Sequence, residues 1–254
     1  MLNMQSATGY AKASIAAFSK WLRVFPLPLL IGAVVAYPTP SLPLASTASA
    51  EAEDLAERML NALCGRTAWA STTNTVNDSQ QNWDGEPALL RVVITMDFEQ
   101  PRFRVDTRAD RLHVVRVVDG DRHWRVTRDG SVSPVPEEVP AADRRWYQAH
   151  VYRTLHRIAR RDPAIRPLVG KEGRLEVHEG AARIAWYALD RSAQPYRYGA
   201  HDDDIGSIFG PWEAQSSGIR HPVWVSRDNG RWRAMLKSFD VNVALDEKLF
   251  TPPR

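Results

Sequence analysis

The stretch from Pro101 to Gly130, PRFRVDTRADRLHVVRVVDGDRHWRVTRDG, determines how the rest of the chain is interpreted. Asp-Gly interrupts its runs of valine, tryptophan and threonine twice, at Asp119-Gly120 and again ten residues later at Asp129-Gly130. Asp-Gly between such runs is a strong hairpin signal, because glycine adopts positive φ without a steric penalty. The spacing predicts an antiparallel meander in which each strand pairs with the next.

Strict alternation of apolar and mostly polar residues precedes this stretch and continues into it. We expect half-buried strands whose alternate side chains form one inner face. The inner-face positions are Leu90, Val92, Ile94 and Met96 before this stretch, Phe103, Val105, Trp124 and Val126 within it, and Ile184 and Trp186 in a later strand. Val115 and Val117 place apolar groups on the opposite side, which predicts that this strand is covered on both faces.

Two segments show helical periodicity instead. The first, residues 51–63, carries acids in its first turn and the apolar stripe Leu55, Met59 and Leu63, and Gly65 ends it. The second begins at Pro140 and ends at Pro163, with Trp146 beside the stripe Tyr147, Val151, Leu155 and Ile158. Its arginine-rich side favours a solvated face over a phosphate site.

The remaining chain adds further strands and one irregular segment. A first strand is expected near residues 73–77, and hairpins at Glu179-Gly180 and at Asn229-Gly230. Residues 190–221 lack periodicity but contain aromatic side chains, which predicts a partly ordered flap with a short helix near 205–209. The predicted fold class is α+β: a curved antiparallel sheet, an incomplete half-barrel, covered by two or three helices.

The N-terminus has the composition of an export signal. Residues 1–50 contain three basic and no acidic residues, an apolar stretch from Phe25 to Tyr37, and an Ala48-Ser49-Ala50 cleavage motif. We predict a signal peptide at 1–50, a single domain at 51–254 and a periplasmic location; an uncleaved anchor is the alternative. Of 33 basic residues, 30 remain against 30 acidic ones. This balance excludes an electrostatic footprint for nucleic acid.

No pattern in the sequence assembles catalytic chemistry. The chain has no G-x-S-x-G, P-loop, G-x-G-x-x-G or H-E-x-x-H motif. His201 to Asp204 offers oxygen ligands for Ca²⁺, but a solvated acidic turn is favoured because the spacing of a calcium loop is missing. Cys64 is the only cysteine and lies at a helix C-terminus, where the dipole does not activate it. We expect no enzyme activity, no metal and no cofactor.

Periodicity leaves two uses for the apolar face. A curved antiparallel sheet can pack its helices into a filled core, or it can leave a cavity for a lipid-like ligand. Both arrangements need the same inward pattern of side chains.

A family resemblance favours the second use. The pattern Pro101-x-Phe103-x-Val105, then Val117-Val118-Asp119-Gly120, then Trp124, is similar to the early strands of LolA-like periplasmic lipoprotein carriers. The tail Phe250-Thr251-Pro252-Pro253 resembles the closing segment of that family. Together these matches cover about a quarter of residues 51–254. Two features depart from the family: the long 190–221 segment, and a lid-locking arginine for which Arg91, Arg102 and Arg104 are all candidates.

The resemblance implies a monomeric carrier without covalent chemistry. Its ligands would be lipid or lipoprotein acyl chains, and its partner an inner- or outer-membrane protein that receives the cargo. The inner-face residues would line the cavity, and a lid would be formed by Leu55, Met59, Leu63, Trp146, Val151 and Leu155. Two alternatives stay open: a periplasmic regulatory binding protein on the same scaffold, and a hydrolase that uses the His201–Asp204 region.

Overall fold

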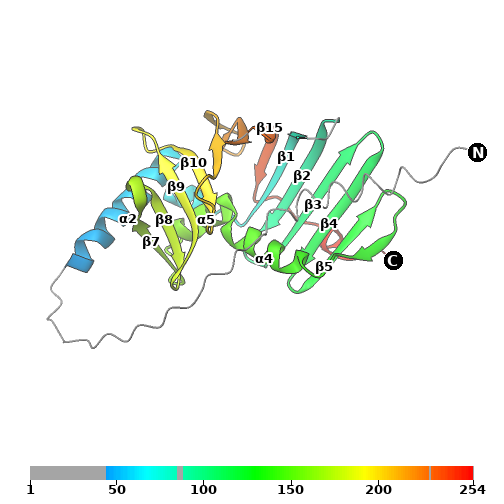
Figure 1. The fold of residues 1–254 in the computed structure, drawn as a ribbon, viewed down its shortest axis with the longest axis horizontal. Coiled ribbons are helices and arrows are strands. Elements are labelled where there is room, and N and C mark those ends of the chain that lie inside the picture. The colour runs from blue at the N-terminus through cyan, green and yellow to red at the C-terminus, as the bar shows by residue number, and fades with distance from the viewer. Residues whose placement is uncertain (1–43, 85–87, 229, 254) are drawn as a thin grey trace, which may run out of the picture.

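The computed structural model describes residues 44–84, 88–228 and 230–253, with no side-chain description for 44–48 (Figure 1). Its helices are α2 (Leu44–Ala62), α3 (Arg66–Ala70), α4 (Val139–Ala149) and α5 (Val151–Ala159), with 3₁₀ turns η2 (Lys171–Gly173) and η3 (Glu247–Phe250). The predicted signal peptide lies almost entirely outside the described residues, and its cleavage motif falls within α2. The leader, its cleavage and the periplasmic location therefore stay predictions.

Fifteen strands lie in the described residues. They are β1 (Asn74–Trp83), β2 (Leu90–Asp97), β3 (Arg102–Ala109), β4 (Leu112–Asp119), β5 (Arg122–Thr127), β6 (Val132–Pro134), β7 (Ile165–Val169), β8 (Leu175–Glu179), β9 (Ala182–Leu189), β10 (Pro195–Ala200), β11 (Ser207–Phe209), β12 (Trp212–Ala214), β13 (Arg220–Pro222), β14 (Trp224–Arg227) and β15 (Trp232–Val241). Thirteen form one antiparallel sheet in the order β6-β5-β4-β3-β2-β1-β15-β14-β11-β10-β9-β8-β7. The predicted α+β class with an open, curved antiparallel sheet is confirmed.

Strand β15 joins the two halves of this sheet. On one side it pairs with β1, from Thr75 opposite Val241 to Trp83 opposite Trp232. On the other side it pairs with β14, where Trp224 lies opposite Met235. Figure 1 shows the long meander β1–β5 on one side of this junction and the shorter strands β7–β10, flanked by α2, on the other.

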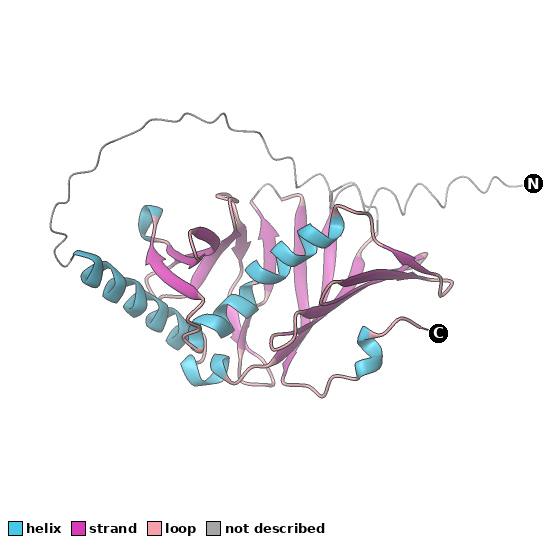
Figure 2. Ribbon diagram, turned by 90° about the horizontal axis from the view of Figure 1, so that it is seen from below, coloured by secondary structure: helices cyan, strands magenta, loops and turns pink. Residues whose placement is uncertain are grey.

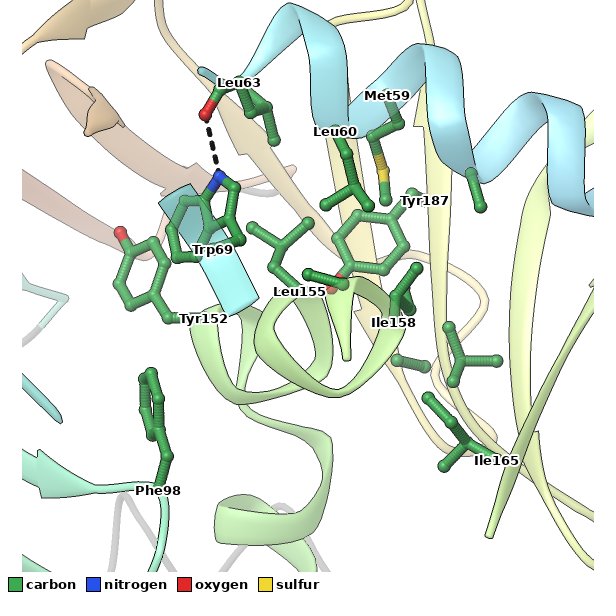
Figure 3. Close-up of a cluster of buried hydrophobic side chains, with 14 of the residues drawn as sticks. Met59, Leu60, Leu63, Trp69, Phe98, Tyr152, Leu155, Ile158, Ile165 and Tyr187 are labelled. Atoms are coloured by element: carbon green, nitrogen blue, oxygen red, sulfur yellow. Dashed lines mark hydrogen bonds between the residues drawn. The ribbon is translucent and has the colours of Figure 1, made fainter. Parts of the chain in front are cut away.

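One hydrophobic core runs through both halves. It contains Met96 and Phe103 from the long meander and Leu175 and Tyr187 from the short strands, with Leu155 of α5 between them. Figure 3 shows α2 and α5 meeting over this core, where the Trp69 indole Nε1 donates to the Leu63 carbonyl at 2.7 Å. Trp69 stacks on Tyr152 with ring centroids 6.0 Å apart. The predicted burial of Met59 and Leu63 is present in this cluster.

A second, smaller cluster covers the opposite face of the long meander. Phe250 of η3 packs on Val115, Val117 and Trp124, with Leu245 and Leu249 at its edge. Figure 2 shows the C-terminal segment on the side of the strands away from α4 and α5. The prediction that the Val115–Val117 strand is covered on both faces is confirmed, and the cover is the C-terminus of the chain.

The helix expected between Pro140 and Pro163 is two helices. His150 separates α4 from α5 with φ −58° and ψ 132°, outside the helical region. The break lets Tyr147 face the long meander while Leu155 and Ile158 face α2 and the short strands. The expectation of a single stripe was wrong, because helical spacing was extended through a residue whose backbone turns.

The 190–221 segment is more regular than predicted. It forms β10, β11 and the small β12–β13 pair, and residues 207–209 are a strand rather than part of a helix. The Trp212 indole donates to the Pro195 carbonyl at 2.7 Å. Strands of three residues are too short for alternation to be detected in the sequence. The other hairpins agree with prediction, with positive φ at Gly120, Gly130 and Gly180; Asn229 lies outside the described residues.

We predict that truncating the C-terminal anchor destabilises the fold. Phe250 is 1% exposed, so Phe250→Ala leaves a cavity against Trp124 and should lower the free energy of unfolding by about 3 kcal/mol. Urea denaturation of the full chain measures this. Val132→Ala, at an exposed position of β6, is the control and should change stability by less than about 0.5 kcal/mol. Equal effects of the two substitutions would contradict the role assigned to Phe250.

Candidate functional site

The inner face is the side of β2–β4 that faces α4 and α5. The register places Met96, Phe103 and Val118 directly opposite one another, followed by Ile94 opposite Val105. Side chains of directly paired residues lie on the same side of a sheet, and alternation adds Leu90 and Val92. The predicted inner-face positions of β2 and β3 therefore share one face: Leu90, Val92, Ile94, Met96, Phe103 and Val105.

Trp124 and Val126 were placed on the wrong face. Trp124 lies opposite Val117, and Val126 lies opposite Val115, so both point toward η3. The inner-face residues of β5 are His123, Arg125 and Thr127, which pair with Val118, Arg116 and Val114. The error arose at the Asp119-Gly120 turn, because the turn length sets which residues of the next strand share a face.

Ile184 and Trp186 separate in the structure. Ile184 belongs to the main core, whereas Trp186 lies on the other side of β9. The Trp186 indole donates to the Asp203 carbonyl at 2.7 Å, and the Arg174 guanidinium lies 4.1 Å from its ring centroid. A Cβ at Gly199 would lie 2.2 Å from the indole nitrogen, so only glycine fits there. The assignment of Trp186 to the inner face was wrong.

Helix α4 is the element that covers the inner face. Trp146 contacts Phe103 edge-on, with ring centroids 4.8 Å apart. The Tyr147 hydroxyl lies 2.7 Å from the Asp97 carbonyl oxygen and 2.9 Å from that of Gln100, at the β2–β3 turn. Val151 packs at the edge of the core, and Leu155 lies fully inside it.

Helix α2 occupies a different position from the predicted lid. Met59 and Leu63 are fully buried in the core, and Leu55 packs at its edge. The helix lies on β7 and α5, beside the short strands. Its apolar stripe was identified correctly, but the sequence does not specify which half of the sheet the stripe covers.

Two charged groups join α4 to the inner face. Asp143 of α4 is 1% exposed and lies 3.2 Å from the Arg116 guanidinium of β4 and 3.4 Å from the His123 ring. Burial raises the pKa of Asp143, while Arg116 and His123 act in the opposite direction. Burial also lowers the pKa of Arg116. A buried pair of this kind depends on both members, since removing one leaves the other charge uncompensated.

Sequence reasoning missed this pair. The arginines considered for locking the lid point away from the helices: Arg91 binds Asp78, Arg102 binds Asp97 and Glu247, and Arg104 binds Asp106. Arg116 is the arginine of the long meander that contacts α4 in the described residues. One signal was available, because Asp143 is the only acidic residue between Glu138 and Asp162.

A polar and aromatic cluster lies where α4 meets α5. It consists of Asn77 on β1, His150, Tyr152 and His221. The Asn77 amide Nδ2 lies 2.9 Å from His221 Nε2, and the His221 ring lies 5.2 Å from Tyr152 and 4.5 Å from Phe239. No spacing in the sequence indicates this cluster, because 71 positions separate His150 from His221.

The acidic turn at His201–Asp204 does not converge on a metal site. Asp202, Asp203 and Asp204 each face a different arginine: Arg145, Arg227 and Arg183. Among the described residues, no group of three or more His, Cys, Asp or Glu side chains could hold a metal ion. No helix in the described part of the chain has the length and hydropathy needed to span a membrane.

Among the hollows on the surface of the described residues, two lie away from the inner face. One, about 300 Å³, lies between the end of α2 and residues 191–193. The other, about 420 Å³, lies where α5 ends, beside Arg157, Arg161 and Ile165. Neither is lined by a predicted site residue.

Comparison with known proteins yields structural similarity alone. No protein-family model matches the chain, and no curated protein matches it. A crystal structure of a DUF1329 family protein from Desulfovibrio piger aligns at 9% identity and TM-score 0.38, covering 80% of this chain and 97% of that one. An uncharacterized conserved protein from Thermus thermophilus aligns at 12% identity and TM-score 0.36, covering 80% and 94%. The resemblance to LolA-like carriers stays a prediction.

We predict that acid destabilises the protein through the polar cluster. Burial lowers the pKa of His221 to about 3, and burial together with His221 and Arg153 lowers that of His150 to about 3, from the usual 6.5. Folding therefore favours the neutral rings. Their contribution to stability is complete above about pH 6.5 and is lost as the pH falls from there toward 3. Urea unfolding at pH 7.5, 6.0 and 4.5 measures the slope.

The variant His150→Phe keeps a ring at this position but removes one titrating group. Its stability should fall less steeply with acid than that of the wild type between pH 6.5 and 4.5. Carboxylates titrate in both proteins, so the difference between the two slopes isolates the histidine. Identical slopes would rule out a contribution from His150.

Proposed function

We propose that this protein is a non-enzymatic carrier in the periplasm that binds acyl chains of lipids or lipoproteins against its inner face. One observation carries the proposal: apolar side chains of the inner face continue beyond the contact with α4, beside Thr107 and Arg116. Ile94, Val105 and Val114 are half-buried, whereas Phe103, under Trp146, is fully buried. A row of apolar side chains on a curved sheet offers an extended chain a surface to lie along.

Simple energetics suffice for such binding. Each CH₂ group removed from water contributes about 0.8 kcal/mol, so a few acyl chains bind without any specific chemistry. On the outer face, charged side chains pair with one another, as Arg91 with Asp78 and Arg104 with Asp106. The apolar side chains of that face, around Trp124, are already covered by Phe250. The inner face is therefore the region best suited to an apolar ligand.

Release requires a cover whose position can change. Helix α4 is held on the long meander by Trp146 on Phe103, by the Tyr147 hydroxyl on the β2–β3 turn and by Asp143 beside Arg116. On its other side, the His201 ring Nε2 lies 2.9 Å from the Arg145 carbonyl oxygen, so opening must also break this contact. The break at His150 separates α4 from α5, which is anchored in the core by Leu155. We propose that α4 swings about His150 to admit and release the ligand, and that a membrane-bound partner accepts it.

The family resemblance supports this function without defining the cargo. LolA-like carriers resemble this chain in the Phe103–Val105 strand, the Asp119-Gly120 turn and the C-terminal Phe250-Thr-Pro-Pro segment. In the structure the first and last of these pack against each other through Arg102, whose guanidinium lies 4.5 Å from the Phe250 ring centroid. The residues that carry the resemblance thus share one region of the fold.

A substitution on the inner face tests the function. Ile94→Asn places a polar group where the acyl chain would lie and should weaken binding of a fluorescent fatty acid about tenfold, a loss of about 1.4 kcal/mol. Fluorescence titration of the purified full chain measures the affinity.

Val93→Asn is the matched control. Val93 is the neighbouring residue of β2, equally half-buried, but it points to the outer face between Asp78 and Asp106. Its affinity for the fatty acid should match that of the wild type. The proposal fails if the wild type binds no acyl ligand, or if both substitutions weaken binding equally.

A further inference from the structure

We infer that Asn77 and His150 form a polar subsite beside the inner face, which takes a neutral hydrogen-bond donor of the ligand, an amide N–H or a hydroxyl next to its acyl chain. The inference rests on the proposed function and adds to it the chemical class of the ligand. It starts from hydrogen-bonding capacity that the protein leaves unused.

The orientation of Asn77 follows from His221. The His221 Nδ1 atom lies 2.6 Å from the Pro222 carbonyl oxygen, which can only accept, so Nδ1 carries the ring proton. Nε2 of the neutral ring is then an acceptor, and it receives the Asn77 Nδ2 amide at 2.9 Å. This fixes the Asn77 side chain with its carbonyl oxygen directed elsewhere.

That oxygen has no hydrogen-bond partner. Asn77 Oδ1 and His150 Nδ1 are both buried polar atoms left unpaired within the protein. A buried polar atom without a partner costs on the order of 1–3 kcal/mol, so a group that donates to it gains that amount back. A neutral histidine has one acceptor nitrogen, and burial lowers the pKa of His150, which keeps its ring neutral. Its unpaired Nδ1 is the acceptor in the tautomer that carries the proton on Nε2.

The subsite adjoins the proposed path of the acyl chain. Asn77 lies directly opposite Ile94 in the β1–β2 pair, and Ile94 lies opposite Val105. His150 contacts the Trp146 ring at 4.8 Å and the Tyr152 ring at 5.3 Å. An amphiphile lying along the inner face would therefore bring the group at its polar end to these two acceptors.

Charge selects a neutral donor over a cation. The charged and titratable groups that act on His150 are His221 and Arg153, and both disfavour positive charge there. An ammonium group would be buried without a counter-ion, which is strongly unfavourable. Amides and hydroxyls donate without carrying charge and meet both requirements.

Matched ligand pairs test the inference in the wild-type protein. Dodecanamide is compared with N,N-dimethyldodecanamide, and 1-dodecanol with its methyl ether, by displacement of a fluorescent fatty acid from the full chain. Each pair shares the acyl or alkyl chain and differs in the donor. We expect the donor compound of at least one pair to bind about tenfold more tightly. The pair that shows the preference identifies an amide or a hydroxyl as the natural group.

Variants locate the preference. Asn77→Leu and His150→Phe should each reduce the donor preference to below about threefold while retaining binding of the compounds without a donor. Asn82→Leu, at an exposed position of the same strand, should keep the full preference. Thermal unfolding checks that each variant is folded. If one variant does not fold, the other variant and the wild-type ligand comparison test the inference.

The outcomes separate the two proposals. Binding of both members of each pair with equal affinity would overturn the polar subsite and leave the carrier function standing. A preference that persists in both Asn77→Leu and His150→Phe would overturn the assignment to these residues. No binding of any of the four compounds or of the fluorescent fatty acid would overturn the carrier function itself.

Discussion

The ion pair between Asp97 and Arg102 connects the two layers that cover the long meander. Both residues are buried, and the Arg102 Nε atom lies 2.9 Å from the Asp97 carboxylate. On the inner side, the Asp97 carbonyl accepts the hydroxyl of Tyr147 from α4. On the outer side, Arg102 holds Glu247 with two hydrogen bonds and lies against Phe250. Hydrogen bonds to Glu247 and Asp97 raise the pKa of Arg102 above its usual range. The turn between β2 and β3 therefore binds both α4, on the inner side, and η3 at the C-terminus, on the outer side.

Polar groups inside this fold serve different purposes on its two faces. On the outer face, acids and arginines pair with one another, as Arg104 does with Asp106. On the inner face, Asp143 and Arg116 hold a helix, while Asn77 and His150 retain unpaired atoms. Natural proteins pair nearly all buried polar atoms, so each unpaired one calls for an explanation. The apolar row and the unpaired acceptors lie side by side, which is the arrangement an amphiphile requires.

The local sequence pattern was sufficient to predict the strands, but it was insufficient to predict how they assemble. Alternation at Leu90–Met96 and the Asp-Gly turns defined the meander, because both depend only on neighbouring residues. Trp124 was assigned to the wrong face, because a difference of one residue in the length of a turn moves every side chain of the next strand to the opposite face. The break at His150 carries no proline or glycine to announce it. Asn77 lies in the main sheet, His150 between two helices and His221 in the small β12–β13 pair, so no spacing in the chain could reveal that they come together.

The position of β15 has a consequence for biosynthesis. This strand is the last of the sheet to be made, yet it lies between β1, the first strand, and β14. Until residue 241 has left the ribosome, β1 has a bare edge and the two halves share no backbone hydrogen bonds. Contacts between such distant segments form slowly, since a long loop must close before they bring any gain. The sheet is therefore completed only once β15 is available, and until then the chain keeps an open edge that a chaperone could shield.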